Sequence, residues 1–299
     1  MKENILIVGT GALATLFAAR LTEAGYHITL LGTWKEGIDS LRRNGARLLD
    51  ANGDEHQFEV DATGDPRECA GAKYAIVLVK AWQTERAARQ LAECLAENGL
   101  AVTLQNGLGN RETLVGSLRE DRVALGTITV GATLLSPGLV KVGGDGIISI
   151  ERNPALGPVE AALRSAKFQV NIVQDAQSAV WGKLVVNAAI NPLTALLRIP
   201  NGELLNRPSA HEMMGKLAHE VAEVAFAENI RLPFDDPLAM AEEVARKTAT
   251  NKSSMLQDLL RSAPTEIDAI CGAVVVTAQK HKIDTPANWA CWKLIKALS

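Results

Sequence analysis

Three polar side chains in the second half of the chain have the spacing of one helix face. Lys183, Asn187 and Asn191 stand at i, i+4 and i+8 in the segment 181–193, which reads WGKLVVNAAINPL. In a helix they would stack along one side, and the other positions are almost all apolar, as in a buried helix. A buried ammonium and two buried amides are costly without partners. The stripe therefore indicates either a polar pocket or a structural network between helices, and spacing alone leaves both interpretations open.

Pro192 favours the pocket. A proline lacks the backbone donor and disfavours a helical conformation for the residue before it, so we expect the helix to kink or end beside Asn191. A second charged candidate is Glu266, in the segment TEID that we expect to begin a later helix. A carboxylate in a first helical turn is also stabilised by the helix dipole alone, so a purely structural role stays open for it.

The N-terminal stretch predicts a nucleotide site. Residues 4–8 (NILIV) are typical of a buried parallel strand, and a helical segment with Gly25 as its C-terminal stop follows a Gly-rich turn. Strand, Gly-rich turn and helix is the context that the dinucleotide fingerprint requires, with a pyrophosphate on the helix N-terminal amides. The alternative is a tight turn without a ligand. The expected cofactor-binding residues of this turn are Gly9, Thr10, Gly11, Ala12, Leu13 and Ala14.

The second strand, 27–31, indicates which cofactor binds. NAD-specific folds often place an acidic residue after this strand, on the ribose 2′-hydroxyl. Here the chain has Thr33, Trp34 and Lys35 instead. Lys35, with the Thr33 hydroxyl, could hold a 2′-phosphate, which favours NADP. An exposed lysine at a helix N-terminus is the alternative, and the sequence does not decide between the two.

Two further polar residues follow predicted strands. Lys80 comes after the strand 74–79, and Asn106 comes after the strand 101–104. Ligands of open α/β sheets bind at the carboxyl ends of strands. We therefore expect Lys80 to pair with a phosphate or a carboxylate, and Asn106 to hydrogen-bond the nicotinamide ribose. A turn before Gly107 is the ordinary alternative for Asn106.

The remaining patterns predict an α/β fold with an N-terminal Rossmann-type dinucleotide-binding domain, 1–173, followed by an all-α domain, 174–299. In the first domain we expect a hairpin around Asn52-Gly53, a helix closed by Gly99, and strands from 123–150 added to the same sheet, with an edge strand last. In the second we expect helices at 209–229, 236–251, 255–263, 265–281 and 287–298, the first with a capping box of Ser209 and Glu212.

Composition narrows the function class. The 299 residues include 31 Lys and Arg against 34 Asp and Glu, with no basic block, so neither nucleic acid nor a membrane surface is an expected partner. The four cysteines, Cys69, Cys94, Cys271 and Cys291, are far apart and show no metal-ligand spacing. We expect no metal site, no signal peptide, no membrane span and a reducing cytoplasmic location. The oligomeric state is not readable, and a homodimer stays open.

The motifs together resemble the ketopantoate reductase (2-dehydropantoate 2-reductase) family. Several of them, including the run around Lys183 and the pair SSMLQD with TEID, are more specific than a Rossmann fingerprint. Family members often carry an arginine after the second strand, where this chain has Thr33, Trp34 and Lys35. The matching stretches are IVGTGALA near the N-terminus, VKAWQT at 79–84, QNGLGN at 105–110, WGKLVVNAAINPLTAL at 181–196, PNGEL at 200–204, NKSSMLQDL at 251–259 and TEIDAICG at 265–272.

The resemblance implies NADPH-dependent reduction of the 2-keto group of ketopantoate to (R)-pantoate, a step towards pantothenate and coenzyme A. It implies Lys183 as the general acid and Glu266 as its orienting partner. Lys80, Asn106 and Ala132 would lie along the cofactor with the Gly-rich turn. Three alternatives stay open: a reductase of the same architecture acting on another 2-keto acid, a 3-hydroxyacid dehydrogenase that runs in the other direction, and a non-catalytic NADP-binding sensor. The expected substrate-binding residues are Asn187, Asn191, Asn201, Asn251, Ser253 and Ser254.

Overall fold

A computed structural model of the chain describes residues 4–50, 52–144 and 146–298. Ala51 of the predicted hairpin, Asp145 of the predicted strand region and the first three and last residues of the predicted domains lie outside these ranges. The chain divides into two compact units. The sheet unit extends to Gln105 and resumes at Asn110–Ala176, and the helical unit combines Asn106–Gly109 with Gln177–Ser299. The helical unit thus contains a four-residue segment from the first half of the sequence.

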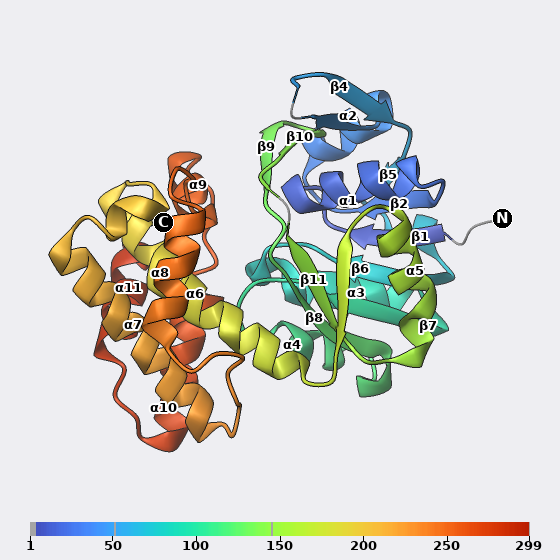
Figure 1. The fold of residues 1–299 in the computed structure, drawn as a ribbon. Coiled ribbons are helices and arrows are strands. Elements are labelled where there is room, and N and C mark those ends of the chain that lie inside the picture. Colours follow the sequence, from blue (N-terminus) through green and yellow to red (C-terminus); the bar gives the residue numbers. More distant parts are fainter. Residues whose placement is uncertain (1–3, 51, 145, 299) are drawn as a thin grey trace. The chain divides into compact units, whose positions relative to one another are not determined.

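The sheet unit is built on a large, mostly parallel sheet in which β1 lies between β2 and β6 (Figure 1). The six strands of this sheet that come first along the chain have the spatial order of a dinucleotide-binding fold. Ligands of that fold bind where the strand order reverses, which is here beside β1. The strands, in spatial order, are β12 (Gln169–Val173), β11 (Ile147–Glu151), β8 (Val123–Ile128), β7 (Leu95–Thr103), β6 (Ala72–Val77), β1 (Asn4–Val8), β2 (His27–Leu31) and β5 (Asp61–Thr63).

A second sheet contains the predicted hairpin and corrects one expectation. Strands β9 and β10 do not extend the large sheet, because they pair instead with the hairpin β3–β4. Helix α1 packs against both sheets and lies between them in Figure 1. Leu16, Phe17 and Leu21 of α1 are fully buried. The large sheet covers one side of α1, and the second sheet covers the side that would otherwise be exposed. The strands of this sheet are β4 (Glu55–Phe58), β3 (Ala46–Leu49), β10 (Leu139–Val142) and β9 (Ala132–Ser136).

Gly99 has a different role from the predicted one. Helix α3 ends at Cys94, and Gly99 lies inside the following strand β7. A Cβ atom at Gly99 would come within 2.8 Å of the Ala72 carbonyl oxygen on the neighbouring strand β6. The glycine therefore permits close strand packing and does not terminate a helix. The helices of the sheet unit are α1 (Ala12–Glu23), α2 (Lys35–Asn44), α3 (Thr84–Cys94), α4 (Asn110–Val115) and α5 (Gly157–Ser165).

The helical unit is organised around α6 (Ala176–Leu197), which the sequence predicts to kink or end beside Asn191; the helix does not end there. Asn191 is helical, and the helix continues to Leu197. Leu193 and Ala195 beyond the proline are buried in the same core as the first part of the helix, so their burial offsets the lost backbone hydrogen bond. The helices are α6 (Ala176–Leu197), α7 (Pro208–Ala227), α8 (Pro237–Lys247), α9 (Ser254–Leu260), α10 (Ala273–His281) and α11 (Pro286–Lys296).

Several helix boundaries of this unit differ from the expected ones; α9, for example, ends at Leu260 and not at residue 263. The predicted capping box on α7 is wrong, because the helix begins at Pro208 and Ser209 is already helical. Proline is favoured at the first helical position, where its missing N–H has no intrahelical partner. Helix α8 ends at Lys247 and does not reach residue 251; Asp236 accepts from the Ala239 N–H at its start.

Helix α6 also has the length and apolar composition of a membrane span, in contrast to the expectation from the sequence. However, 72% of its most apolar window is buried inside the protein. Core helices of soluble proteins pass the same test, so composition alone does not assign this helix to a membrane. Its apolar side chains contact the neighbouring helices of the unit, as expected for a helix at the centre of a core.

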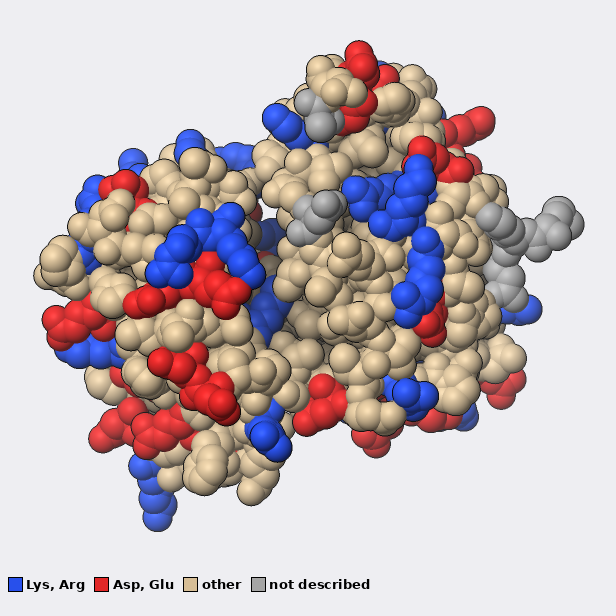
Figure 2. Space-filling view, viewed as in Figure 1, with Lys and Arg blue, Asp and Glu red and all other residues tan. Residues whose placement is uncertain are grey.

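The surface carries both charge signs close together. Lys and Arg are interspersed with Asp and Glu over the face shown in Figure 2. Elsewhere along the described helices, opposite charges form i,i+4 pairs, such as Arg89 with Glu85, Arg164 with Glu160, and Lys216 with Glu212. Such exposed pairs contribute little stability.

Candidate active site

The structure brings Lys183 together with two residues that are far from it in the sequence. The Lys183 Nζ donates to Asn106 Oδ1 at 2.7 Å, and Asn106 Nδ2 donates to Glu266 Oε2 at 3.0 Å. An ammonium can only donate and a carboxylate can only accept, so the two neighbours fix the orientation of the amide between them. We call these three residues the Lys183 cluster. All three belong to the helical unit.

The environment of Lys183 makes its ammonium more acidic than usual. Burial lowers the pKa of Lys183 to about 8, and the nearby Glu266 carboxylate opposes this by favouring the charged form. Glu266 itself is only 5% exposed. A lysine with a pKa near 8 is still mostly protonated at neutral pH, yet it loses a proton more readily than an exposed lysine does. These are the properties of a general acid.

The segment that carries Glu266 departs from the predicted α-helix. Glu266 precedes a π-helix, Asp268–Gly272, and therefore does not lie in the first turn of an α-helix. Its carbonyl oxygen accepts from the N–H groups of Ala269 and Ile270, and its carboxylate accepts from Asn106. Short π-helical turns often occur at functional sites. Nothing in the sequence pattern distinguished this turn from an ordinary helix start.

Asn187 and Asn191 lie on the same face of α6 as Lys183, as predicted. Asn191 is 7% exposed and Asn187 is half-buried. Among the residues that the structure describes, neither side-chain amide has a hydrogen-bond partner. Buried amides normally have partners, so the two groups are available to a polar ligand.

Ser253 is already engaged within the protein. It caps the N-terminus of α9 by accepting from the Leu256 N–H at 3.1 Å, and its hydroxyl lies 2.8 Å from that of Thr194 on α6. The adjacent Ser254 is exposed. Ser253 therefore joins α9 to α6 about one turn beyond Asn191.

Asn201 and Asn251 lie together through their backbones. The Asn201 N–H donates to the Asn251 carbonyl at 3.0 Å, and the Asn201 side chain donates to Thr248 Oγ1 at 2.9 Å. Asn251 is exposed, whereas the buried Oδ1 of Asn201 has no partner among the described residues. Asn201 thus keeps one acceptor that a ligand donor could use.

The Gly-rich turn, Gly9–Ala14, fits a dinucleotide pyrophosphate. Gly9 has φ +135°, and a Cβ atom there would come within 3.2 Å of the Leu78 backbone. Gly11 is the N-cap of α1 and places no side chain of its own over the amides of the first turn, and nothing among the described residues lies within 4 Å of where its Cβ would be. Thr10 and Ala14 are buried, while Ala12 and Leu13 are half-buried. Backbone N–H groups at an open helix N-terminus favour a phosphate.

The other predicted cofactor residues of the sheet unit have different surroundings. Lys80 follows β6, whose end packs against the turn at Gly9. Lys35 is the first residue of α2, and its exposed ammonium pairs with Asp39 at 2.5 Å, as in the structural alternative. Ala132 begins β9 in the second sheet. The cofactor roles of these residues stay predictions.

A buried polar network near the same strand ends was not predicted. Gln105 donates through Nε2 to the Val79 carbonyl at 3.0 Å and to Thr84 Oγ1 at 2.8 Å, and the Thr84 hydroxyl lies 2.8 Å from Asn110 Oδ1. The network joins the residues after β6 and β7 to the starts of α3 and α4. It holds in place the two chain segments that lead to Lys80 and Asn106, and the motifs VKAWQT and QNGLGN contain all four of its residues.

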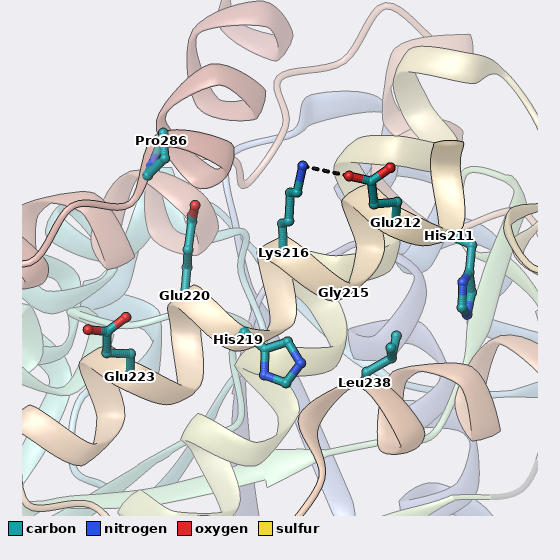
Figure 3. Close-up of a pocket in the computed structure, with 9 residues that line it drawn as sticks. All are labelled: His211, Glu212, Gly215, Lys216, His219, Glu220, Glu223, Leu238 and Pro286. Carbon is teal, nitrogen blue, oxygen red and sulfur yellow. Dashed lines mark ion pairs between the residues drawn. The ribbon is translucent and has the colours of Figure 1, made fainter. Parts of the chain in front are cut away.

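A surface hollow lies along α7, and one of its charged side chains, Glu220, has a structural role within the protein. Its side chains include His219, Glu220 and the Lys216–Glu212 pair (Figure 3). The Glu220 carboxylate accepts from the Ala287 and Asn288 N–H groups at 2.8 and 2.9 Å, which caps α11. The hollow contains none of the predicted site residues.

The sequence matches the family models for ketopantoate reductase PanE/ApbA over residues 5–155 and for the C-terminal part of this family over residues 175–299. The chain belongs to the ketopantoate reductase family. A 2-dehydropantoate 2-reductase of Halobacterium salinarum is 34% identical, over 95% of this chain and 94% of the relative. One of Vibrio cholerae is 32% identical, over 99% and 97%.

Solved structures agree with this assignment. A ketopantoate reductase of the PanE/ApbA family from Ralstonia eutropha superimposes with a TM-score of 0.91 at 30% identity, covering 99% of this chain and 98% of that one. D-mandelate dehydrogenase in complex with NADH and anilino(oxo)acetate gives a TM-score of 0.92 at 23% identity, with the same coverage. The second likeness shows the fold alone. The expected α/β fold and the family resemblance are confirmed.

Proposed function

We propose that this protein reduces 2-dehydropantoate to (R)-pantoate with NADPH, in the pathway to pantothenate and coenzyme A. Family membership over nearly the whole chain supports the reaction. The observation that carries the proposal is the Lys183 cluster, in which Asn106 and Glu266 hold a half-buried ammonium. Hydride addition to a carbonyl places negative charge on its oxygen, and a positioned ammonium can neutralise that charge.

The chemistry follows from the residues of the cluster. NADPH, when bound, supplies the hydride that forms the new C–H bond at the 2-keto carbon. Lys183 donates a proton to the keto oxygen, so that the C=O double bond becomes a C–OH group and the lysine is left neutral. Glu266 and Asn106 keep the ammonium charged and oriented until that transfer. Solvent can then return a proton to Lys183.

We assign cofactor roles and substrate roles to separate sets of residues. We assign the Gly-rich turn and Lys80 to the cofactor, with Lys35 on its 2′-phosphate and Ala132 beside it, and Asn106 to the nicotinamide ribose as well as to Lys183. We expect Asn187 and Asn191 to contact the substrate directly, since both amides are available. We also keep Asn201, Asn251, Ser253 and Ser254 as substrate-binding residues. We further expect domains 1–173 and 174–299 to divide these tasks.

Substrate choice is the part of the proposal most open to test. Steady-state rates should be measured with NADPH and 2-dehydropantoate, beside NADH and a panel of other 2-keto acids. We expect 2-dehydropantoate to give the highest kcat/KM, because a substrate lacking its hydroxyl leaves buried polar groups unpaired. A higher kcat/KM for another acid, such as an aromatic 2-keto acid, would move the protein to the alternative reductase. NADPH binding without turnover of any acid would support the non-catalytic sensor.

The remaining expectations concern binding partners, cellular location and oligomeric state. The partner is a small keto acid, and we expect neither nucleic acid nor a membrane to bind. The four cysteines are buried free thiols, which agrees with a reducing cytoplasmic location. A homodimer stays a hypothesis that sedimentation of the purified protein would test.

A further inference from the structure

Asn106 reaches the Lys183 cluster on a loop that contacts the π-helix through its backbone. Gly107 has φ +81°, a region that side chains disfavour. A Cβ atom at Gly107 would lie 2.3 Å from the Ala269 carbonyl oxygen and 2.7 Å from the Ala269 Cβ. The same carbonyl accepts from the Leu108 N–H at 2.9 Å. The loop therefore lies directly on Ala269 with no room for a side chain.

This contact joins two parts of the cluster. The Ala269 N–H donates to the Glu266 carbonyl at 3.1 Å, and the residue before Gly107 is Asn106. One backbone contact thus connects the residue after Asn106 with the turn that follows Glu266. A shift of the loop away from Ala269 would move the Asn106 amide relative to both the carboxylate and the ammonium.

We propose that Gly107 is a positioning residue: its contact with Ala269 fixes the amide of Asn106 between Lys183 and Glu266. The inference rests on the proposed role of Lys183 as the proton donor. Gly107 has no side chain to offer the ammonium or the carboxylate, so we expect it to act through Asn106. Because misplacement of a catalytic group by about 1 Å can reduce a rate by about 100-fold, a small shift here has a large effect.

The chain offers matched variants for a test. Gly109 lies in the same loop with φ +85°, but nothing is within 4 Å of where its Cβ would be. Gly107→Ala and Gly109→Ala therefore carry similar backbone strain, and only the first disturbs the contact. Ala269→Val disturbs the contact from the other side without backbone strain. Ala273→Val adds the same bulk at another half-buried alanine further along the same helical segment.

Two measurements on the full-length protein separate positioning from general damage. The first is kcat with its pH profile, measured with 2-dehydropantoate and NADPH. The second is the titration of Lys183 without substrate, which is monitored by competitive labelling with acetic anhydride and mass spectrometry. We expect Gly107→Ala and Ala269→Val to lower kcat by about tenfold to 100-fold and to displace the titration from the wild-type curve, since the ammonium loses its Asn106 acceptor. Gly109→Ala and Ala273→Val should match wild type.

Wild-type kcat and titration in a folded Gly107→Ala protein would overturn the inference. Equal losses in the two control variants would also overturn it. If Gly107→Ala does not fold, Ala269→Val gives the answer by the same two measurements. If the wild-type protein does not turn over 2-dehydropantoate, the proposed function fails, but the titration still reports whether Gly107 positions Asn106 beside Lys183.

Discussion

The Gly-rich turn and the Lys183 cluster offer different kinds of chemical groups to a ligand. The turn offers mainly backbone: two glycines, an uncapped helix N-terminus and few side-chain groups. The cluster offers side chains, an ammonium, an amide and a carboxylate in one hydrogen-bonded chain. Backbone amides suit a phosphate, whose charge does not change during the reaction, whereas a titratable side chain suits an oxygen whose charge does change.

The two regions also differ in how they are assembled. The turn is continuous in sequence, and its conformation follows from glycine positions between a strand and a helix. The cluster is assembled from three segments of the chain. Its two hydrogen bonds join Asn106 to Lys183, 77 residues away, and Asn106 to Glu266, 160 residues away. Substitutions in the turn should therefore change cofactor affinity, and substitutions in the cluster should change the chemical step. The predictions below test this division.

The largest effect is expected for Lys183→Ala. Removing the proton donor should lower kcat by at least about 100-fold, while the dissociation constant for NADPH stays within about twofold of wild type. Stopped-flow rates and fluorescence titration with NADPH measure the two quantities. Lys216→Ala, an exposed lysine of the same unit, is the control and should match wild type. An unchanged kcat in Lys183→Ala would remove Lys183 from its catalytic role.

The reverse pattern is expected for Gly9→Ala. The added Cβ meets the Leu78 backbone at an unfavourable positive φ, so we expect NADPH binding to weaken by about tenfold. At saturating NADPH, kcat should fall much less. The control is Gly53→Ala in the β3–β4 hairpin, which also has a positive φ, +92°, but open space around it. Loss of kcat without loss of NADPH affinity would break the division between the regions.

A smaller and pH-dependent effect is expected for Glu266→Gln. The Glu266 carboxylate favours the charged form of Lys183, so its loss lowers the pKa of Lys183 further. A general acid must be protonated, and activity therefore should begin to decline at a lower pH than in wild type. The pH profile of kcat for the variant, compared with the exposed Glu223→Gln, measures the shift. A profile that moves to higher pH would refute the electrostatic account of Glu266.

The smallest effect is expected for Lys35→Ala, because Lys35 is exposed and already paired with Asp39. If Lys35 reads the 2′-phosphate, KM for NADPH should rise by about three- to tenfold and KM for NADH should not change. Arg43→Ala, on the same helix, controls for a general loss of positive charge. Equal KM values for NADPH in wild type and Lys35→Ala would assign Lys35 to the surface of α2 alone.

The sequence predicted the local features more completely than the long-range ones. The strand, Gly-rich turn and helix at the N-terminus could be recognised because each depends on neighbouring residues. The stripe of Lys183, Asn187 and Asn191 was also predicted, since helical spacing is local. The sequence could not predict that Asn106 bridges Lys183 and Glu266, because this bridge depends on how distant segments pack.

The wrong predictions have the same cause. Of the two outcomes expected at Pro192, a kink or a helix end, the end is wrong, because burial of the residues after the proline keeps them helical. Gly99 was expected to stop a helix, but the neighbouring strand requires it inside β7. The π-helix after Glu266 has no signature in residue spacing. In each case tertiary packing decided between local alternatives that the sequence left close in energy.

The measurement that tests the central claim most directly is the pH dependence of hydride transfer in the wild-type protein. NADPH oxidation should be followed from neutral to alkaline pH at 2-dehydropantoate concentrations well below KM, where the rate reports the ionisation of the protein before the substrate binds. We expect a rate that is nearly constant at neutral pH and falls above a pKa of about 8, as the Lys183 ammonium loses its proton. A rate that stays constant or rises through this range would contradict the role of Lys183 as the proton donor.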